Sequence, residues 1–365
     1  MALARYVADV VTGLEDLAAG ELRRLGAAAV APGRGEVRFD HDRVGRVLRR
    51  SRLVSAVFLA LAFDVPRPKA LLGDAAFRRL AGAVRDVAAG AGMRTFRLAA
   101  AGVESPVFQR LASALAQATG LAHDPEDGEL LARFRRHGDG WEALLRLTPR
   151  PLSTRAWRVC NLPGGANATV AAAMADLAGA EGSYLNLMCG SGTLLVERAL
   201  AGPRGRLVGV DVAAEAVACA ARNLAAAGVE GAELVVDDVA RPGFRVPGEF
   251  DVVAADAPWG DAVGDHAANE ALYRALFSAA RRHLAPGGRF ALLSHEVRLV
   301  ERLLREGGWR ALEARRVEHG GHRPLLVVLQ ADAGRGGNGG AALHGPADDE
   351  ASAPRGASGG GRGGA

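Results

Sequence analysis

Three carboxylates stand at the ends of short apolar runs, where they could bind a nucleotide-like ligand. They are Asp211, Asp238 and Asp256. If each run is a strand of one parallel sheet, the three side chains lie at its carboxyl edge, which is where such sheets bind ligands. Ionised carboxylates accept hydrogen bonds. Asp211 is therefore a candidate partner of ribose hydroxyls, Asp238 of an adenine amino group, and Asp256 of an exocyclic amine.

A glycine-containing turn precedes these carboxylates in the chain. Residues 184–194 predict a buried strand, a Gly-Ser-Gly turn and the start of a helix. Glycines let the backbone pass close to a ligand, and the following helix directs its free N–H groups towards the turn. Asp211 comes 19 residues after Gly192, near the spacing at which a Rossmann-type sheet places its ribose-binding acid. The order indicates a nucleotide-like ligand.

The residues that follow the third apolar run could orient an amine. Asp256 is followed by Ala257, Pro258, Trp259 and a glycine. Proline restricts the loop backbone, and an indole face can stack on a base with about 1–3 kcal/mol. This arrangement predicts an amine held for attack on an electrophile. The alternative is a structural turn with a buried tryptophan.

Alternating strands and helices must position these groups. After the glycine turn we expect strands at 207–211, 233–237, 250–255, 289–294 and 323–330 and helices at 214–227, 268–284 and 297–306. Such alternation predicts a doubly wound α/β sheet. His266, Asn269 and Tyr273 follow the Asp256 loop at helical spacing and could line a base pocket, and His295 follows a strand at the same edge.

Composition limits the class of protein. The 365 residues are 49% apolar, with neither a transmembrane-length apolar run nor a signal peptide, which favours a soluble globular protein. The cysteines Cys160, Cys189 and Cys219 lack metal-site spacing, and we expect them to be reduced in a cytoplasmic protein. Residues 1–160 contain 25 Lys and Arg against 17 Asp and Glu. This basic excess favours a polyanionic partner such as RNA.

At this point the motifs resemble a known family. Residues 186–193, Asp211, Asp238 and residues 256–260 are similar to class I S-adenosylmethionine-dependent methyltransferases. More narrowly, they resemble the THUMP-domain RNA guanine-N2 methyltransferases. The front half is similar to that family's ferredoxin-like segment and THUMP domain, and residues 151–155 are similar to the usual exit from THUMP.

The resemblance implies a division of the chain and a set of roles. Residues 1–150 would form a ferredoxin-like plus THUMP RNA-binding region, 151–160 a linker, 161–330 the Rossmann-like methyltransferase domain, and 331–365 a disordered Gly-rich tail. The cofactor S-adenosylmethionine would be bound by Asn186, Cys189, Gly190, Gly192, Asp211 and Asp238. The catalytic residues would be Asp256, Ala257, Pro258 and Trp259. The substrate would contact Trp259, His266, Asn269, His295 and Arg155.

The reaction implied is methylation of the N2 amino group of a guanosine in tRNA, without metal. In many amino methyltransferases two prolines follow the Asp or Asn, and here Ala257 replaces the first; the resemblance includes such variants in the tRNA-acting branch. The alternatives are an rRNA guanine-N2 methyltransferase, an N6-adenine DNA methyltransferase, a non-catalytic RNA-binding scaffold and an NAD-dependent dehydrogenase. The last has no use for the Asp256 loop.

Overall fold

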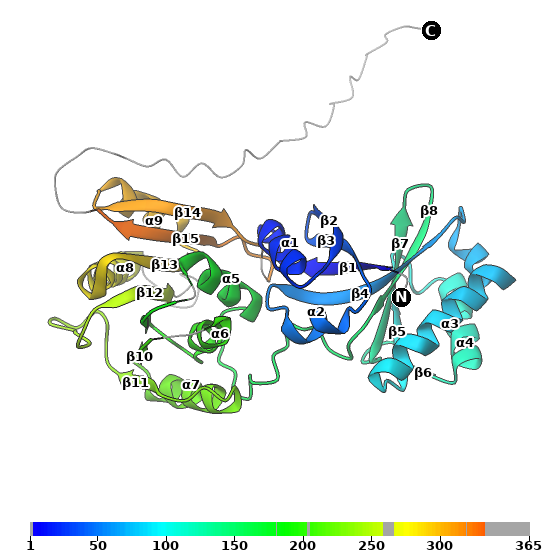
Figure 1. The fold of residues 1–365 in the computed structure, drawn as a ribbon, viewed down its shortest axis with the longest axis horizontal. Coiled ribbons are helices and arrows are strands. Elements are labelled where there is room, and N and C mark those ends of the chain that lie inside the picture. The colour runs from blue at the N-terminus through cyan, green and yellow to red at the C-terminus, as the bar shows by residue number, and fades with distance from the viewer. Residues whose placement is uncertain (1–2, 180, 203–204, 258–265, 319, 333–365) are drawn as a thin grey trace, which may run out of the picture.

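A computed structural model describes residues 3–179, 181–202, 205–257, 266–318 and 320–332. It contains two sheets that lie along the long axis of the molecule (Figure 1). The front sheet has the strand order β2-β3-β1-β4-β8-β7-β5-β6, and the second sheet has the order β11-β10-β9-β12-β13-β15-β14. Each sheet is built from one continuous part of the chain.

The first half of the front sheet follows a β-α-β-β-α-β order, as in ferredoxin-like folds. Its elements are β1 (Ala4–Val10), α1 (Glu15–Arg24), β2 (Ala28–Gly33), β3 (Glu36–His41), α2 (Gly45–Arg50) and β4 (Val54–Phe63). Leu22 of α1 and Val47 of α2 are buried in one core with Phe39 and Val57 of the sheet. Both helices therefore cover the same face.

The second half of the front sheet continues from β4. Its elements are a 3-10 turn (Pro68–Leu72), α3 (Asp74–Ala91), β5 (Thr95–Ala99), α4 (Pro106–Thr119), β6 (Ala122–His123), β7 (Leu130–His137) and β8 (Gly140–Arg146). Leu61 and Phe63 of β4 pack with Leu80 of α3 and Leu111 of α4. Alternate strand residues face the same side, and Val57 shares the parity of Leu61. The four helices α1 to α4 therefore cover one face, and none of the described helices covers the other.

The second sheet is doubly wound. Its strands are β9 (Tyr184–Leu187), β10 (Leu207–Asp211), β11 (Ala232–Val236), β12 (Phe250–Asp256), β13 (Leu284–Ser294), β14 (Trp309–Arg316) and β15 (Leu325–Ala331). Strands β9 to β13 are parallel, and β15 is antiparallel to β13 and to β14. This confirms the predicted α/β fold.

Helices cover both faces of this sheet, so its central strands are buried on both sides. The helices are α5 (Ala168–Ala178), α6 (Thr193–Ala201), α7 (Ala214–Ala226), α8 (His266–His283) and α9 (Val297–Arg305). Helices α5, α6 and α7 share a core with α1 and α2, whereas α8 and α9 pack on the opposite face. None of the described helices combines the length and the apolar composition that crossing a bilayer requires.

The described cysteines differ from the expectation that all three are reduced. Cys160, at the end of the linker, forms a disulfide with Cys219 of α7, at a Cα separation of 5.5 Å. Cys189 is free and buried. The pair joins the linker to the α7 face of the sheet. The two cysteines are 59 positions apart in the sequence, and no sequence pattern predicts their contact.

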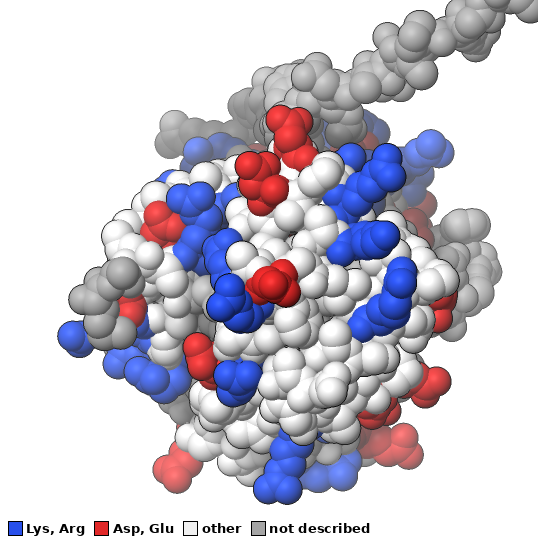
Figure 2. Space-filling view, turned by 90° about the vertical axis from the view of Figure 1, so that its right-hand side faces the viewer, with Lys and Arg blue, Asp and Glu red and all other residues white. Residues whose placement is uncertain are grey.

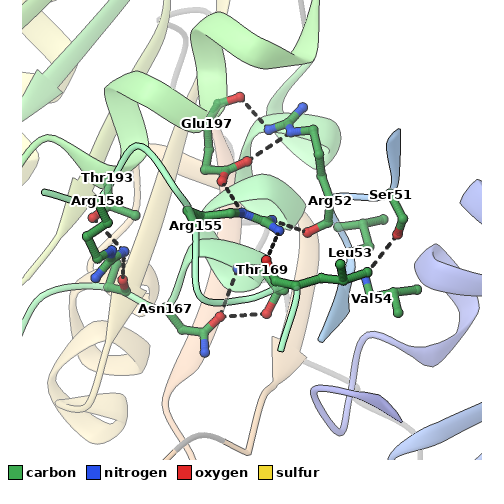
Figure 3. Close-up of polar contacts among 12 residues, drawn as sticks. Ser51, Arg52, Leu53, Val54, Arg155, Arg158, Asn167, Thr169, Thr193 and Glu197 are labelled. Carbon is green, nitrogen blue, oxygen red and sulfur yellow. Dashed lines mark hydrogen bonds and ion pairs between the residues drawn. The ribbon is translucent and has the colours of Figure 1, made fainter. Parts of the chain in front are cut away.

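A buried carboxylate joins the two sheets (Figure 3). Glu197 of α6 has a side chain with 0% exposure, and its two oxygens accept hydrogen bonds from Arg52 Nε and Arg155 Nε, both at 2.8 Å. Arg52 lies between α2 and β4 of the front sheet, and Arg155 lies in the linker. The ion pairs therefore fix α6 against both segments.

Replacing Glu197 tests this junction. The variant Glu197→Gln leaves Arg52 and Arg155 without their anion in a largely desolvated position, so we expect the free energy of unfolding to fall by about 3–5 kcal/mol. Urea unfolding followed by circular dichroism measures the change. The matched control is Glu233→Gln, which removes an exposed ion pair with Arg206 and should cost at most about 1 kcal/mol. Equal losses in the two variants would contradict the assignment.

Candidate active site

The glycine turn after β9 has three residues in the left-handed backbone region. Met188, Gly190 and Gly192 have φ angles of 60°, 53° and 78°. That region is uncommon for a residue with a side chain, and such strain concentrates at functional sites. Met188 is a residue that the sequence did not identify. A positive φ is expected mainly for glycine or asparagine, so a methionine at position 188 gives no reason to predict one.

The two glycines of the turn have different surroundings. A Cβ on Gly192 would lie 2.9 Å from Cβ of Ala220 in α7, whereas a Cβ on Gly190 would meet no described atom within 4 Å. Gly192 is therefore needed for the turn to pack on α7. Gly190 borders open space at the carboxyl edge, as a ligand-facing backbone requires.

Asp211 at the end of β10 is tied to this turn. Its Oδ2 accepts a hydrogen bond of 2.8 Å from the backbone N–H of Gly190, and its Oδ1 accepts one of 3.0 Å from Ala213 N–H. Burial raises the pKa of the neighbouring Cys189 thiol to about 12, with Asp211 adding to the shift. Cys189 is therefore a neutral packing residue of the turn rather than a nucleophile.

Asn186 lies inside the sheet, between β9 and β12. Its side chain is fully buried, and its Nδ2 donates to the carbonyls of Leu187 and Ala254, each at 3.2 Å. Its Oδ1 has no hydrogen-bond partner among the described residues. Asn186 thus links β9, the strand that leads into the turn, to β12.

Asp238 lies after β11, at the same edge as Asp211. It is exposed, and its Oδ1 accepts a hydrogen bond of 2.8 Å from Ala240 N–H. The preceding Asp237 is paired with Arg241, and this hydrogen bond lowers the pKa of Asp237. Asp237 is therefore occupied within the loop, whereas Asp238 keeps its second oxygen towards solvent.

Two valines expose apolar surface at this part of the edge. Val212 follows Asp211 and is 67% exposed, and Val236 at the end of β11 is 54% exposed. In the parallel register Asp211 pairs with Val236. Exposed valines next to two carboxylates form a mixed apolar and polar surface, which suits a flat heterocycle with polar edges.

Asp256 ends β12 at the same edge. The backbone N–H of the next residue, Ala257, donates to Leu293 O at 3.0 Å and holds the strand end against β13. Oδ1 of Asp256 is buried and has no hydrogen-bond partner among the described residues. Burial raises the pKa of Asp256 to about 7. A carboxylate in this condition can accept hydrogen bonds from a ligand and is poised to take up a proton near neutral pH.

A hydrogen-bonded group from three elements lies behind Asp256. Tyr273 of α8 is fully buried, and its hydroxyl is 2.7 Å from Oγ of Ser294 at the end of β13. Ser294 Oγ accepts a hydrogen bond of 3.0 Å from Glu296 N–H, and Asn269 Nδ2 donates to Glu296 Oε1 at 3.4 Å. Burial raises the pKa of Tyr273 to about 12, so Tyr273 stays neutral. Ser294 is a second residue that the sequence analysis did not identify. A serine at the end of an apolar strand would have indicated a polar group at the carboxyl edge.

His295 lies beside a concave surface at this edge. Its ring contacts that of His322, with centroids 5.3 Å apart. It lines a cavity of about 440 Å³ with Glu296, Val297, Arg298, Glu301 and Arg316. The structure therefore brings His295 and Asn269 to the side of the edge where Asp256 lies. The predicted residues Pro258 and Trp259 and the side chain of His266, the first residue of α8, lie outside the described residues.

Arg155, which the sequence predicts to contact substrate, is engaged by groups of the protein. Besides its ion pair with Glu197, its Nη1 donates to Leu152 O and its Nη2 to Arg52 O, each at 2.6 Å (Figure 3). The guanidinium is thus directed into the protein and joins the linker to both sheets. Among the described residues no group of three His, Cys, Asp or Glu side chains could hold a metal ion.

The fold and this edge define a class I methyltransferase, with a mostly parallel seven-stranded sheet and the candidate groups at its carboxyl edge. A family model described as "RMKL-like, methyltransferase domain" matches residues 155–324. A tRNA (guanine(6)-N2)-methyltransferase from Thermus thermophilus is 31% identical over 227 residues, which cover 61% of this chain and 67% of that protein. The chain belongs to the same methyltransferase family as this relative.

Two further comparisons agree. A tRNA (guanine(6)-N2)-methyltransferase from Archaeoglobus fulgidus is 26% identical over 202 residues, which cover 48% of this chain and 51% of that protein. The match thus spans about half the length of that relative. The crystal structure of TrmN from Thermus thermophilus is similar with a TM-score of 0.73 and 26% identity, covering 90% of this chain and 99% of that one.

The raised pKa of Asp256 leads to a pH-dependent stability. Between about pH 4 and 7 the unfolded chain has lost this proton while the folded chain keeps it, so the contribution of Asp256 to stability falls as pH rises through this window. We expect the free energy of unfolding of Asp256→Asn to rise relative to that of the wild type as the pH increases through this window, by up to about 4 kcal/mol. Urea unfolding of both proteins near pH 4 and pH 8 measures the difference. A difference that does not change with pH would contradict the assignment.

Proposed function

We propose that this protein transfers a methyl group from S-adenosylmethionine to the N2 amino group of a guanosine in tRNA. The observation that carries the proposal is the buried Oδ1 of Asp256, which has no partner among the described residues and lies at the sheet edge that also holds the glycine turn and Asp211. Membership of the methyltransferase family and the names of the two relatives support it.

The residues at the edge fit the donor. Open space in front of Gly190 would admit the amino-acid portion of the donor. The carboxylate of Asp211 would accept hydrogen bonds from the ribose hydroxyls with the acceptor sites that the protein leaves unused. Val212 and Val236 would flank the adenine, with Asp238 at its amino group. When bound, S-adenosylmethionine supplies a methyl group that its sulfonium already activates. The protein therefore has to place the acceptor amine and manage its protons.

Asp256 would prepare the acceptor. In guanine the lone pair of the amino nitrogen is spread into the ring, which makes it a weak nucleophile. The Asp256 carboxylate and the Ala257 carbonyl would accept the two N–H groups and turn the lone pair towards the methyl carbon. The new N–C bond forms as the S–C bond breaks, and the amine then loses a proton. A carboxylate whose pKa is about 7 can receive that proton near neutral pH.

The tRNA base would have to leave its stack to reach this edge, at a cost of a few kcal/mol. Trp259 is the predicted stacking surface for it, and His295 and Asn269 lie on the same side. We propose the basic front region, with its ferredoxin-like and THUMP parts, as the module that binds the RNA. We place the activity in the cytoplasm. Disulfides are rare in that compartment, so we expect the Cys160–Cys219 pair to be largely reduced in cells.

Replacing Asp256 tests the catalytic role. We expect Asp256→Asn to lower the rate of methyl transfer to tRNA by about 10²–10⁴-fold, because the amide cannot accept a proton. Affinity for S-adenosylmethionine should be unchanged in calorimetry. In the wild type the rate should rise with pH through about 7 as the carboxylate ionises. Parallel assays with rRNA and duplex DNA identify the substrate, and activity on either in place of tRNA would refute the proposal.

Replacing Asp211 tests the donor site separately. Asp211→Ala removes a charged acceptor and the tie to Gly190 N–H, so we expect affinity for S-adenosylmethionine to fall by about 1.5–3 kcal/mol. Calorimetry measures the loss. Glu233→Ala is the control, because Glu233 lies near the other end of β11 and is paired with Arg206, and this variant should leave the affinity near the wild-type value. Unchanged binding in Asp211→Ala would remove this residue from the site.

A further inference from the structure

Three arginines of the front sheet's helix-free face are paired with neighbouring carboxylates. Arg38 pairs with Glu142 at 2.7 Å, Arg135 with Glu36 at 2.6 Å, and Arg133 with Asp9 at 2.8 Å. These pairs join strands β1 and β3 to β7 and β8. Although this face is rich in arginine, most of its positive charge is compensated within the protein.

The end of the molecule that holds α3 and α4 has no concentrated charge either. Figure 2 shows this end, where blue Lys and Arg side chains are separated by uncharged surface and by red acidic groups. The net basic charge of the front region must therefore be concentrated elsewhere.

Helix α2, the loop before it and the residue just before the linker carry arginines of another kind. Five of them are exposed and have no ion pair or side-chain hydrogen bond to any described residue: Arg43, Arg46, Arg49, Arg50 and Arg150. Val47 anchors α2 in the core. Positions 46, 49 and 50 are three and four residues apart, so their side chains share one side of the helix.

Two adjoining cavities surround these arginines. The larger, of about 1300 Å³, lies between α1, α2, the linker and α6, and the smaller, of about 700 Å³, lies between α2 and the loop before it. Leu25, Arg49 and Arg50 line both. We call the two together the α2–linker groove.

The carboxylates of the larger cavity are already engaged. Glu21 accepts hydrogen bonds from Ser51 Oγ and from two backbone N–H groups. Asp176 faces Arg24 at 3.4 Å, and Glu197 is held by its two arginines. In the smaller cavity only Asp42, among the described residues, adds a negative charge. The groove therefore presents an excess of uncompensated guanidinium groups.

The groove runs beside the helix that begins at the donor turn. Glu197, Leu200 and Ala201 of α6 line it. Along the linker, Arg158 Nη2 donates to Thr193 Oγ1 at 2.9 Å, next to Gly192 (Figure 3). From Glu197 to Thr193 a helix rises about 6 Å. Ala201 lies about 12 Å from Thr193 along the same helix, so a polyanion in the groove would lie one to two helical turns further from the glycine turn than Thr193.

We propose that the α2–linker groove binds the phosphodiester backbone of the RNA substrate. This inference rests on the proposed function and assigns the surface that binds the RNA backbone. Guanidinium groups bind phosphates through paired hydrogen bonds, and a row of them along a groove follows a sugar–phosphate chain without reading its sequence. Because α6 joins the groove to the donor turn, RNA bound there is positioned relative to the carboxyl edge.

A triple substitution tests the groove. We expect Arg49→Gln, Arg50→Gln and Arg150→Gln together to reduce the slope of log affinity for tRNA against log salt by about 2–3, and the affinity itself roughly tenfold or more at moderate salt. Filter binding at several salt concentrations measures both. The melting midpoint and calorimetry with S-adenosylmethionine verify that the variant is folded.

The matched control removes the same charge elsewhere. Arg245, Arg282 and Arg305 are exposed and have no ion pair among the described residues, so their joint replacement by Gln should leave the salt slope unchanged. Equal effects in the two variants, or none in the groove variant, would overturn the groove while wild-type methylation of tRNA still supports the proposed function. Failure of the wild type to bind or methylate tRNA would overturn both.

Discussion

The buried carboxylate of Glu197 is the interaction on which the arrangement of the two sheets depends. Removing a carboxylate from water is costly unless well-placed partners compensate it. Here the partners come from the front sheet and from the linker, through Arg52 and Arg155. The same helix begins at Thr193, directly after the glycine turn. These ion pairs, together with the apolar core that α1 and α2 share with α5, α6 and α7, therefore set the position of the front region relative to the donor turn.

Asp256 shows the opposite treatment of a buried carboxylate. Glu197 has both oxygens satisfied within the protein, whereas Asp256 keeps a buried oxygen without a partner among the described residues. Burial raises the pKa of Asp256 to about 7. A buried carboxylate with an unpartnered oxygen lowers the stability of the fold, and such a cost is usual for a group that binds ligands and transfers protons. The two carboxylates thus separate the structural charge from the reactive one.

The sequence predicted the parts of this fold that depend on local pattern. Short apolar runs ending in Asp211 and Asp256, with a glycine turn before them, indicate parallel strands that end at one edge, and the structure has them there. Strand β14 was not predicted. Its alanines, glutamate and arginines favour helix, and it is a strand because β15 offers it an antiparallel edge.

Contacts between distant residues were not predictable in the same way. A proline- and arginine-rich linker indicates charge, but nothing in it shows that Arg155 meets Glu197, 42 residues away. The positive φ of Met188 and the Cys160–Cys219 bond likewise depend on the folded geometry. Local pattern therefore predicted which residues lie at the edge, and tertiary structure decided which of them are free to bind.

The same limit applies to charge. A basic excess in residues 1–160 indicates a polyanionic partner, but a count of arginines does not separate those that bind carboxylates from those that remain available. On the helix-free face Arg38, Arg133 and Arg135 pair with carboxylates across strands, while the exposed arginines of α2 have no carboxylate partner among the described residues. The buried ion pairs of Glu197 and helix α6 then connect the unpaired arginines to the donor turn. Because these contacts hold the groove and the donor turn in one folded unit, the fold sets the distance between the groove and Asp256, and this distance limits which nucleotide of a bound RNA can reach the edge.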